Sequence, residues 1–352
     1  MKRMFLTGLA VCLLLTILAG CYSKDSGDTA DKATESIKIS VVTDTGGRND
    51  QGFNQSAWEG LQALEKEHPN VEISCIESKQ AADYGPNIEQ AVEAKIDLIL
   101  GIGFSLGDDL EAAAAKNPEI SFGLFDCAIK NLLNNTTGVT FNAQEASFLA
   151  GAAGAKTTKT NNMGFVGGMK VPVIDAFEFG FRGGSDYVAK ELGKTITVHS
   201  NCVQSFSDAA KGKATAFDLF NNKGCDVVFA AAGGSGNGAL EAAAEAGKLA
   251  IGVDRDQSSL APKNVLTSAI KDVGRAVKLV CEDYIKGGAT AIGGANRTYG
   301  LKDGCVGLPE KNPNMAPEVV EYVKKVEEKI KKGEITPPKD EASYNEFVKT
   351  LK

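Results

Sequence analysis

Histidine is scarce in this sequence, and the motifs of familiar hydrolases are missing. The 352 residues include two histidines, His68 and His199, and no Gly-x-Ser-x-Gly or His-Glu-x-x-His pattern. Because histidine is the commonest acid–base and metal-ligating side chain, the sequence offers no visible group for acid–base catalysis. No pair of cysteines has Cys-x-x-Cys spacing, so a metal site is not expected either. The sequence therefore argues against an enzyme, and no cofactor is expected.

An excess of positive charge is also lacking. Lysine and arginine number 38 against 45 acidic residues, which leaves a formal net charge of -7. Proteins that bind nucleic acid carry a basic surface, so a nucleic-acid partner is not expected. Beyond the N-terminus, no apolar run has the length of a membrane helix. With 43% hydrophobic residues, the chain has the composition of a globular protein long enough for two domains of about 130–150 residues.

The N-terminus differs from the rest of the chain. Lys2 and Arg3 precede an apolar run over residues 9–18, which is typical of a secretory signal peptide. The run ends in Leu18-Ala19-Gly20-Cys21, which resembles the lipobox of bacterial lipoproteins, whose cysteine becomes the acylated first residue. The alternative is an ordinary secretory cleavage site beside a chance cysteine. We expect a signal peptide at 1–20, lipid on Cys21 and a flexible tether at 21–36, so that the protein is held at the extracytoplasmic face of the cell membrane.

Six cysteines remain in the exported body of the chain. Export permits disulfides, but six cysteines allow fifteen full pairings, and the sequence does not choose among them. The pair that we select for testing is Cys202–Cys225. Cys75, Cys127 and Cys281 lie in apolar runs and are expected in the core.

Strand-like and helix-like segments alternate through most of the body, which predicts parallel sheets covered by helices. Two such halves follow each other without a linker rich in proline or serine, which indicates two lobes joined by crossing strands. We expect residues 37–142 and 250–285 in an N-terminal lobe, and 143–249 and 286–352 in a C-terminal lobe. Residues 287–307 are expected to be irregular, and a polar tail is expected after a helix at 317–332.

The stretch from Asp44 to Gly60 holds the first group of candidate ligand-binding residues. It follows an apolar strand at 37–42 and leads into a helix, an arrangement that places ligands in open α/β sheets. Asp50 and Asn54 offer hydrogen bonds, and Phe53 offers a flat apolar face. The alternative is purely structural: a turn that caps the helix, with Phe53 packed into the core.

Aspartates mark the ends of two further predicted strands. Asp126 follows Phe125 and Asp254 follows Val253, whereas Asp226 begins its strand and is expected to be a turn cap. A carboxylate at a strand end can bridge two ribose hydroxyls or accept from a ring N–H. The glycine-rich segment 233–238 lacks the Lys-Ser/Thr ending of a P-loop. We therefore interpret it as a loop that lets the backbone of Gly233 and Gly234 approach a ligand closely.

Aromatic residues and one lysine complete the candidates. Phe177, Phe179 and Phe181 alternate at the start of a helix, and the sequence leaves open which of them faces a ligand. To stack on both faces of a flat ligand base, the cleft needs one aromatic ring from each lobe, so we pair Phe177 with Phe53. Lys271 is placed to reach a ligand oxygen, and a solvent-exposed lysine is the alternative.

Seven motifs together resemble the basic membrane protein (Bmp) family of lipoproteins, which includes purine nucleoside receptors of the PnrA type. The resemblance runs in order from about residue 37 to 310. The motifs are Asn49-Asp-Gln-Gly-Phe-Asn-Gln-Ser-Ala-Trp-Glu-Gly60, Phe125-Asp126, Glu145-Ala-Ser-Phe-Leu-Ala-Gly151, Gly164-Phe-Val-Gly-Gly168, Phe177-Glu-x-Gly-Phe181, Ala232-Gly-Gly-x-Gly-Asn-Gly238 and Gly252-Val-Asp-x-Asp-Gln257.

The resemblance implies a type I periplasmic-binding-protein fold, in which two Rossmann-like lobes with three crossovers close on a central ligand cleft. It also implies the substrate-binding component of an ABC importer for purine nucleosides such as guanosine, inosine or adenosine. One departure is Gly52, where the family often has serine. By this resemblance, the base would stack between Phe53 and Phe177. The edge of the base would be bound by Asp50, Asn54 and Asp126. The ribose would be bound by Asp254, Lys271, Gly233 and Gly234.

The first hypothesis is thus a lipid-anchored, monomeric receptor that hands a purine nucleoside to the permease and ATPase subunits of an importer. Three rivals remain: a receptor of the same fold for a sugar or a small signalling molecule, an exported nucleoside-cleaving hydrolase, and a structural surface adhesin. Ribose alone needs no pair of rings, a hydrolase needs an activated water, and an adhesin binds no small ligand saturably. The preferred purine stays open.

Overall fold

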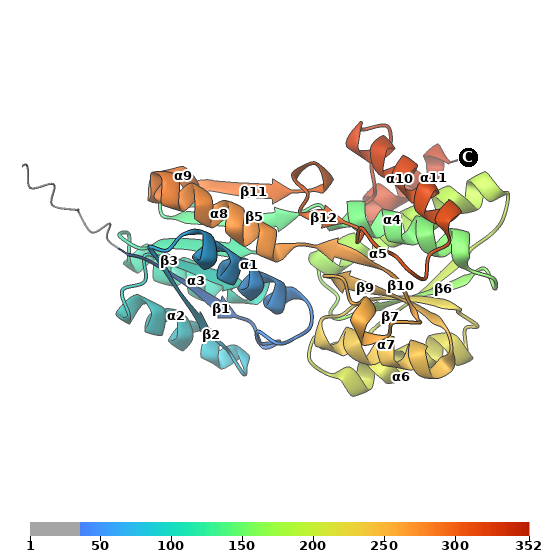
Figure 1. Cartoon of the computed structure of the whole chain (residues 1–352), viewed down its shortest axis with the longest axis horizontal. Helices are drawn as coiled ribbons and strands as arrows, with labels where there is room; N and C mark the ends of the chain where they lie inside the picture. Colours follow the sequence, from blue (N-terminus) through green and yellow to red (C-terminus); the bar gives the residue numbers. More distant parts are fainter. Residues whose placement is uncertain (1–35, 352) are drawn as a thin grey trace, which may run out of the picture. The chain divides into compact units, whose positions relative to one another are not determined.

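Two sheets of six strands form the framework of the part of the chain that the structure describes (Figure 1). The computed structural model describes residues 36–351. The expected signal peptide, Cys21 and all but the last residue of the expected tether lie outside them. Within the described residues, no helix combines the length and apolar character that crossing a membrane requires.

The first sheet is parallel throughout and explains the apolar runs of the N-terminal half. Its central strands are buried along their whole length, because helices cover both faces of the sheet. In spatial order the strands are β2 (Val71–Ile76), β1 (Ile37–Thr43), β3 (Leu98–Ile102), β4 (Ser121–Phe125), β5 (Thr136–Phe141) and β11 (Ala295–Tyr299).

The second sheet repeats the strand order of the first. Its five long strands are parallel, and a two-residue strand pairs antiparallel with the fifth. In spatial order the strands are β7 (Thr197–Cys202), β6 (Asn162–Gly167), β8 (Val227–Ala231), β9 (Leu249–Asp254), β10 (Val265–Lys271) and β12 (Val306–Gly307). Each position in one sheet therefore has a counterpart in the other, with β4 matched by β9 and β5 by β10.

Helices cover both faces of the first sheet. On α1, Ala57, Leu61 and Leu64 recur at helical spacing and pack with α8 in one core, while α2 and α3 cover the opposite face. The helices of this lobe are α1 (Phe53–Glu67), α2 (Tyr84–Glu93), α3 (Gly107–Lys116), α8 (Val273–Gly287) and α9 (Ala289–Ile292), with short 3-10 turns η1 (Ala81–Asp83) and η2 (Phe104–Leu106).

The second sheet is covered in the same way. Helix α4 is buried on nearly every side and consists mainly of small residues, so that α5 packs closely against it. A β-carbon on Gly184 of α5 would overlap the carbonyl of Phe148, which explains the glycine. The helices are α4 (Ala143–Thr157), α5 (Pro172–Leu192), α6 (Ala209–Asn221), α7 (Gly234–Ala246), α10 (Pro317–Lys331) and α11 (Glu341–Thr350), with η3 (Ser258–Leu260) and η4 (Leu301–Asp303).

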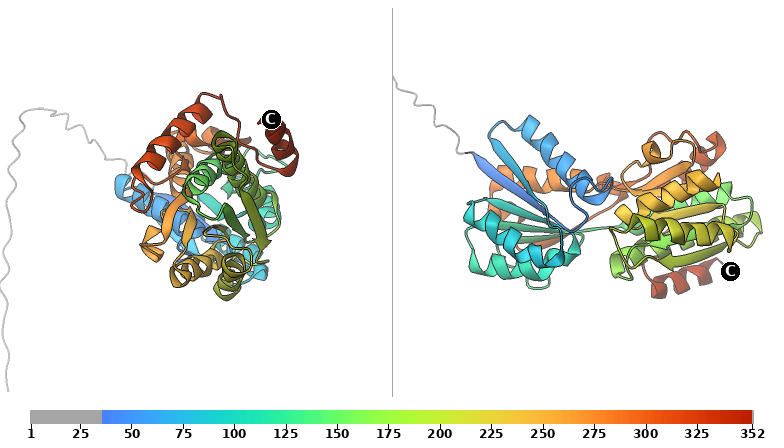
Figure 2. Two further views of the ribbon diagram at one scale, coloured as in Figure 1. Left: turned by 90° about the vertical axis from the view of Figure 1, so that its right-hand side faces the viewer. Right: turned by 90° about the horizontal axis from the view of Figure 1, so that it is seen from below.

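The chain passes between the lobes three times: after β5, after β10 and after β11 (Figure 2). The division of the strands between the two sheets differs from the lobe boundaries that the sequence led us to expect. Residues 249–271 were expected mostly in the first lobe, but β9 and β10 complete the second sheet. Residues 286–299 were expected in the second lobe, but α9 and β11 lie with the first. The sequence hides the second crossing, because a single residue separates β10 from α8.

Several elements were not predicted, and most of them lie at these crossings. Neither β5 nor β10 was predicted, the stretch 287–307 contains α9, β11 and β12 rather than irregular backbone, and the polar tail contains α11. The long alternating strands and helices were found in the order expected, which confirms the two-lobed α/β class.

Candidate ligand-binding site

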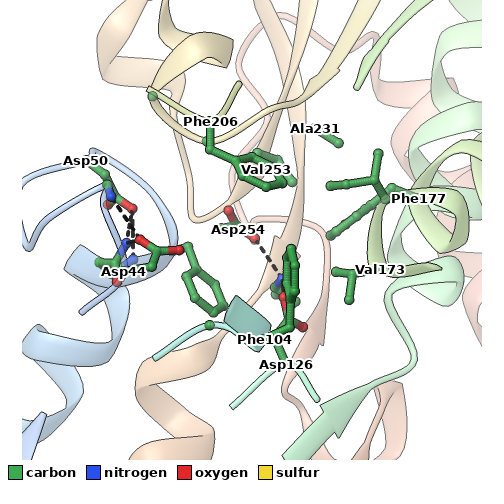
Figure 3. Close-up of a pocket in the computed structure, with 18 residues that line it drawn as sticks. Asp44, Asp50, Phe104, Asp126, Val173, Phe177, Phe206, Ala231, Val253 and Asp254 are labelled. Atoms are coloured by element: carbon green, nitrogen blue, oxygen red, sulfur yellow. Dashed lines mark hydrogen bonds and ion pairs between the residues drawn. The ribbon is translucent and has the colours of Figure 1, made fainter. Parts of the chain in front are cut away.

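The carboxyl ends of strands from both sheets meet at one cleft (Figure 3). It is lined by 18 residues from the two lobes. Ligands bind at such strand ends in open α/β sheets, so the topology itself gathers these side chains. All nine expected ligand-binding residues line the cleft: Asp50, Phe53, Asn54, Asp126, Phe177, Gly233, Gly234, Asp254 and Lys271.

The two strand-end aspartates share an unusual backbone conformation. Asp126 has φ of 69° and Asp254 has φ of 65°, in the left-handed region that non-glycine residues rarely adopt. They occupy matching places, after β4 and at the end of β9. Such strain costs about 1–3 kcal/mol and is typical of ligand sites. In both lobes, the turn directs a carboxylate into the cleft.

Lys271 is the cation at the centre of the site. Its Nζ lies 2.8 Å from Oδ2 of Asp126 and 3.6 Å from Oδ1 of Asp254, and all three side chains are at least nine-tenths buried. Burial opposes protonation of Lys271, but the two carboxylates outweigh it and hold the pKa of Lys271 above its usual value. Burial raises the pKa of Asp254 to about 6, although Lys271 partly offsets this shift. Oδ1 of Asp254 is buried and accepts no hydrogen bond from the described residues.

Aromatic rings from both lobes face the same ammonium group. The Nζ of Lys271 lies 4.5 Å from the ring centre of Phe53, 5.4 Å from that of Phe177 and 5.8 Å from that of Phe141. Phe53 begins α1 in the first lobe, and Phe177 lies on α5 in the second. The two rings that the sequence paired therefore border one point of the cleft from opposite lobes.

The structure also decides among the three alternating phenylalanines. Phe177 lines the cleft. Phe181 is fully buried and packs against Phe229, with ring centres 5.3 Å apart. Phe179 packs instead against Tyr344 of α11, with ring centres 5.6 Å apart. Phe177 is thus the one of the three that a ligand in the cleft can touch.

Asn54 connects two carboxylates on the first-lobe side of the cleft. Its Nδ2 donates to Oδ1 of Asp44 at 2.7 Å and to Oδ2 of Asp50 at 3.0 Å. Asp44 and Asp50 lie together in Figure 3, apart from Asp126 and Asp254. With its donor group engaged, Asn54 presents Oδ1 as a buried acceptor without a partner among the described residues.

Asp50 caps the start of helix α1 and has few acceptor positions left for a ligand in the cleft. Its oxygens accept from the backbone N–H groups of Gly52, Asn54 and Gln55 at 2.9–3.1 Å, in addition to the amide of Asn54. Both carboxylate oxygens are thus committed to the turn and to the first turn of α1. The structural alternative weighed for this stretch holds for Asp50, which borders the cleft but has little acceptor capacity left.

Asp44 was missed as a candidate from the sequence. It follows β1 and lines the cleft, and its Oδ1 accepts from the N–H of Gly46 at 2.9 Å. Burial raises the pKa of Asp44 to about 6; the hydrogen bonds from Gly46 and Asn54 oppose this shift, and the nearby carboxylates add to it. Its position at a strand end, like that of Asp126, was the available signal.

Phe104 and Phe206 were also missed. Phe104 starts η2 in the first lobe, and Phe206 follows β7 in the second; both line the cleft. Their rings meet edge to face across the lobes, with centres 6.4 Å apart. Phe104 lies within Gly101-Ile-Gly103-Phe-Ser-Leu-Gly107, which resembles a loop for close ligand approach, but no pattern marks Phe206.

The glycine-rich segment 233–238 was expected to be a loop, but in the structure it forms the start of a helix. Gly233 has φ of 53° and precedes α7, which begins at Gly234. A β-carbon on either residue would crowd the carbonyl of Phe206, at 3.1 and 3.2 Å. The expectation that this backbone comes close to the cleft is met, and it brings the positive end of a helix there.

Two further expectations concern residues outside the cleft. Asp226 accepts from the N–H groups of Lys159 and Thr160, so it is a turn cap as predicted. Cys202 and Cys225 are both free thiols, which contradicts the pair selected for testing. Because β7 and β8 flank β6 in parallel, Cys202 aligns with Gly167 while Cys225 precedes the register of Met163. The two thiols therefore lie at opposite ends of the sheet, about 20 Å apart along the strands.

Among the described residues, one group of potential metal ligands lies close together: Glu67, His68 and Glu282. Lys278 already occupies this group, with its Nζ 2.6 Å from Glu67 and 3.9 Å from Glu282. It lies away from the cleft lining and carries no argument for a metal.

Comparison with known proteins shows which family the chain resembles. The model of the Bmp family, described as ABC transporter substrate-binding protein PnrA-like, matches residues 37–341. The chain is 40% identical over 359 residues to the ABC transporter nucleoside-binding protein BmpA of Lactococcus lactis, covering 96% of this chain and 99% of that protein. It is 36% identical over 343 residues to basic membrane protein B of Borreliella burgdorferi, covering 95% and 96%.

Solved structures agree with the sequence relatives. A solute-binding protein of an ABC transporter system from Aeropyrum pernix superposes with a TM-score of 0.76 at 26% identity, covering 90% of this chain and 97% of that one. The expected fold, with two α/β lobes and a cleft between them, is thereby confirmed.

Proposed function

Because the chain belongs to the Bmp family of PnrA-like ABC transporter substrate-binding proteins, we propose that it binds purine nucleosides in the cleft and delivers them to an importer. Proteins of this family are transport components and not enzymes, and they act outside the cytoplasm at a membrane. One observation carries the proposal. Rings from opposite lobes, Phe53 and Phe177, border the same point as the buried group of Lys271, Asp126 and Asp254.

The base is assigned to the space between the two rings, in the stacking geometry that nucleobases favour with aromatic side chains. Its edge then meets Oδ1 of Asn54, a buried acceptor without a partner among the described residues. Asp126 also serves this edge, and Asp44, which the sequence did not single out, adds a second carboxylate. Acceptors of this kind suit the ring N–H and amino groups of a purine.

The ribose is assigned to the other polar group. Oδ1 of Asp254 accepts no hydrogen bond from the described residues, although Lys271 lies 3.6 Å away, and it can accept from a sugar hydroxyl. The ammonium of Lys271 and the backbone of Gly233 and Gly234 supply donors beside it.

The name of the Lactococcus relative, a nucleoside-binding protein, supports this ligand class. The partners that follow are the permease and ATPase subunits of the importer, with the protein acting as a monomer. The anchor that we propose is lipid on Cys21, which would hold the body at the extracytoplasmic face. Replacing Cys21 with serine in whole cells would then release the protein from the membrane fraction and abolish incorporation of labelled palmitate.

Thermal unfolding of the purified protein with added ligands tests the binding proposal. At a concentration about 100 times its dissociation constant, a ligand adds about 2.7 kcal/mol of stability, which raises the melting temperature visibly. Inosine, guanosine or adenosine should raise it, while ribose and free bases should raise it less. A shift with sugars alone would instead favour a sugar receptor, and inosine recovered as base and ribose would favour a hydrolase.

A further inference from the structure

Gln257 closes the motif Gly252-Val-Asp-x-Asp-Gln257, but it does not line the cleft. Its side chain is nevertheless almost completely buried, with 3% exposed. Buried polar side chains are held by hydrogen bonds, so the partners of Gln257 show what it does.

Within its own lobe, Gln257 is fixed to two strands. Its Oε1 accepts from the N–H of Val253 at 2.9 Å, directly before the strained residue Asp254. Its backbone N–H donates to Oγ of Ser268 on β10 at 3.1 Å. The side chain therefore supports the turn that directs Asp254 into the cleft.

The amide end of Gln257 reaches the other lobe. Its Nε2 donates to the carbonyl of Gln51 at 3.0 Å and lies 3.4 Å from Oδ1 of Asn237 on α7. Nδ2 of Asn237 in turn donates to the carbonyl of Asp50 at 3.2 Å. Two amide side chains of the second lobe thus bind two successive carbonyls of the first.

The bound loop carries the first-lobe side of the cleft. Gln51 has φ of 60°, and the Asp50 carboxylate holds both the start of α1 and the amide of Asn54. Any motion that separates the lobes breaks the bonds to Gln257 and Asn237. Because separation exchanges them for bonds to water, each stabilises closure only modestly, which suits a reversible contact.

We propose that Gln257 and Asn237 form an interlobe latch that favours the closed cleft and thereby sets the lifetime of the bound ligand. Gln257 is a positioning residue, acting through Asp254 and the loop at Asp50 and Gln51. The statement on ligand lifetime rests on the proposed function, whereas the statement on closure does not.

A rim contact provides the matched control. Arg255 lies two residues before Gln257 and forms an ion pair with Glu59 of the first lobe at 3.2 Å, with side chains 30% and 47% exposed. Ion pairs as exposed as this one contribute little, because water and salt screen them. It crosses the same gap between the lobes but makes none of the hydrogen bonds of Gln257 and Asn237.

The experiment compares wild type with Gln257→Met, Asn237→Ala and the control Arg255→Gln. Small-angle scattering without ligand measures the radius of gyration, and stopped-flow binding of inosine separates kon from koff. Both latch variants should have a larger radius and a koff raised about three- to tenfold, with kon changed less than twofold. The control should match wild type in radius and koff.

Asn237→Ala keeps the test decisive if Gln257→Met folds poorly, because alanine is favourable in a helix such as α7. Unchanged radius and koff in a folded latch variant would overturn the proposal, as would a control that opens as far as the latch variants. If wild type binds no nucleoside, the proposed function fails, and the scattering result alone then decides on the latch.

Discussion

The ammonium of Lys271 and the carboxylate of Asp126 form a buried ion pair between the lobes, with Nζ and Oδ2 2.8 Å apart. Lys271 ends β10 of the second sheet, and Asp126 follows β4 of the first. Removing one partner of a buried pair leaves the other charge uncompensated, and this penalty exceeds the value of the pair itself.

Replacing Lys271 with methionine should therefore lower the free energy of unfolding by about 3–5 kcal/mol at neutral pH. The loss should shrink at acidic pH, because Asp254, whose pKa burial raises to about 6, then takes up a proton and needs no cation. Urea denaturation between pH 5 and 8 measures both effects. The control is Lys278→Met, whose partner Glu67 is exposed, and it should lose far less stability; an equal loss in both variants would contradict the buried-pair argument.

Replacing Asp254 with alanine should weaken nucleoside binding by about 2–5 kcal/mol, which is at least 30-fold in Kd. The reason is that the ribose hydroxyls and Lys271 both lose a buried charged partner. Isothermal titration with inosine measures the change. Asp256→Ala is the matched control, since Asp256 is exposed and caps the N–H of Ser258. Binding at wild-type strength in Asp254→Ala would remove the ribose role.

Phe53→Leu and Phe177→Leu should each weaken inosine binding by about 1–3 kcal/mol, the range measured for loss of a base-stacking ring. Leucine keeps much of the apolar volume, so the fold should survive. Phe179→Leu is the control, because Phe179 packs on Tyr344 outside the cleft lining. If all three variants bind alike, the two-ring sandwich is wrong.

The raised pKa of Asp44, about 6 in the folded protein, gives a pH-dependent stability. An unfolded aspartate titrates near 3.9, so the folded state binds more protons between about pH 4 and 6. The contribution of Asp44 to the free energy of unfolding therefore falls as pH rises through that window, by up to about 3 kcal/mol. Asp44→Asn removes this dependence.

Urea denaturation of wild type and Asp44→Asn from pH 4 to 7.5 tests this sign. Relative to wild type, the variant should gain stability as pH rises to about 6 and then stay level. A stability difference that is independent of pH would refute the role of burial at Asp44.

The sequence predicted the cleft better than it predicted the sheets. Strand ends and helix starts leave local marks in the sequence, so Asp126, Asp254 and Phe53 could be found. Phe177 was chosen as the ring that the second lobe contributes, and Lys271 as a cation within reach of a ligand oxygen. Asp44 follows β1 and so carries the same strand-end signal, but it was not singled out; its hydrogen bond to Asn54, ten residues later, is visible only in the structure. The role of Asp50 as a helix cap depends on backbone N–H groups, whose directions the sequence does not show.

Strands at the crossings escaped prediction for a different reason. β11 is largely exposed, and its residues Ala-Asn-Arg-Thr-Tyr lack apolar alternation. β10 contains Thr267 and Ser268 within its buried run, and Gly138 interrupts β5. These segments are strands because a neighbouring strand pairs with them, and that pairing spans up to 158 residues between Thr137 and Ala295.

The position of β11 late in the sequence constrains the order in which the two sheets can be completed during synthesis. A ribosome completes β5 by residue 141 but reaches β11 only after β6 to β10 of the other sheet. Until then the nascent chain carries β5 with an unpaired edge, the kind of surface that templates aggregation. The first lobe therefore lacks its edge strand until residue 299 has been made, and the second lobe lacks β12 until residue 307. A chain that terminates before residue 295 would leave both sheets without their last strand.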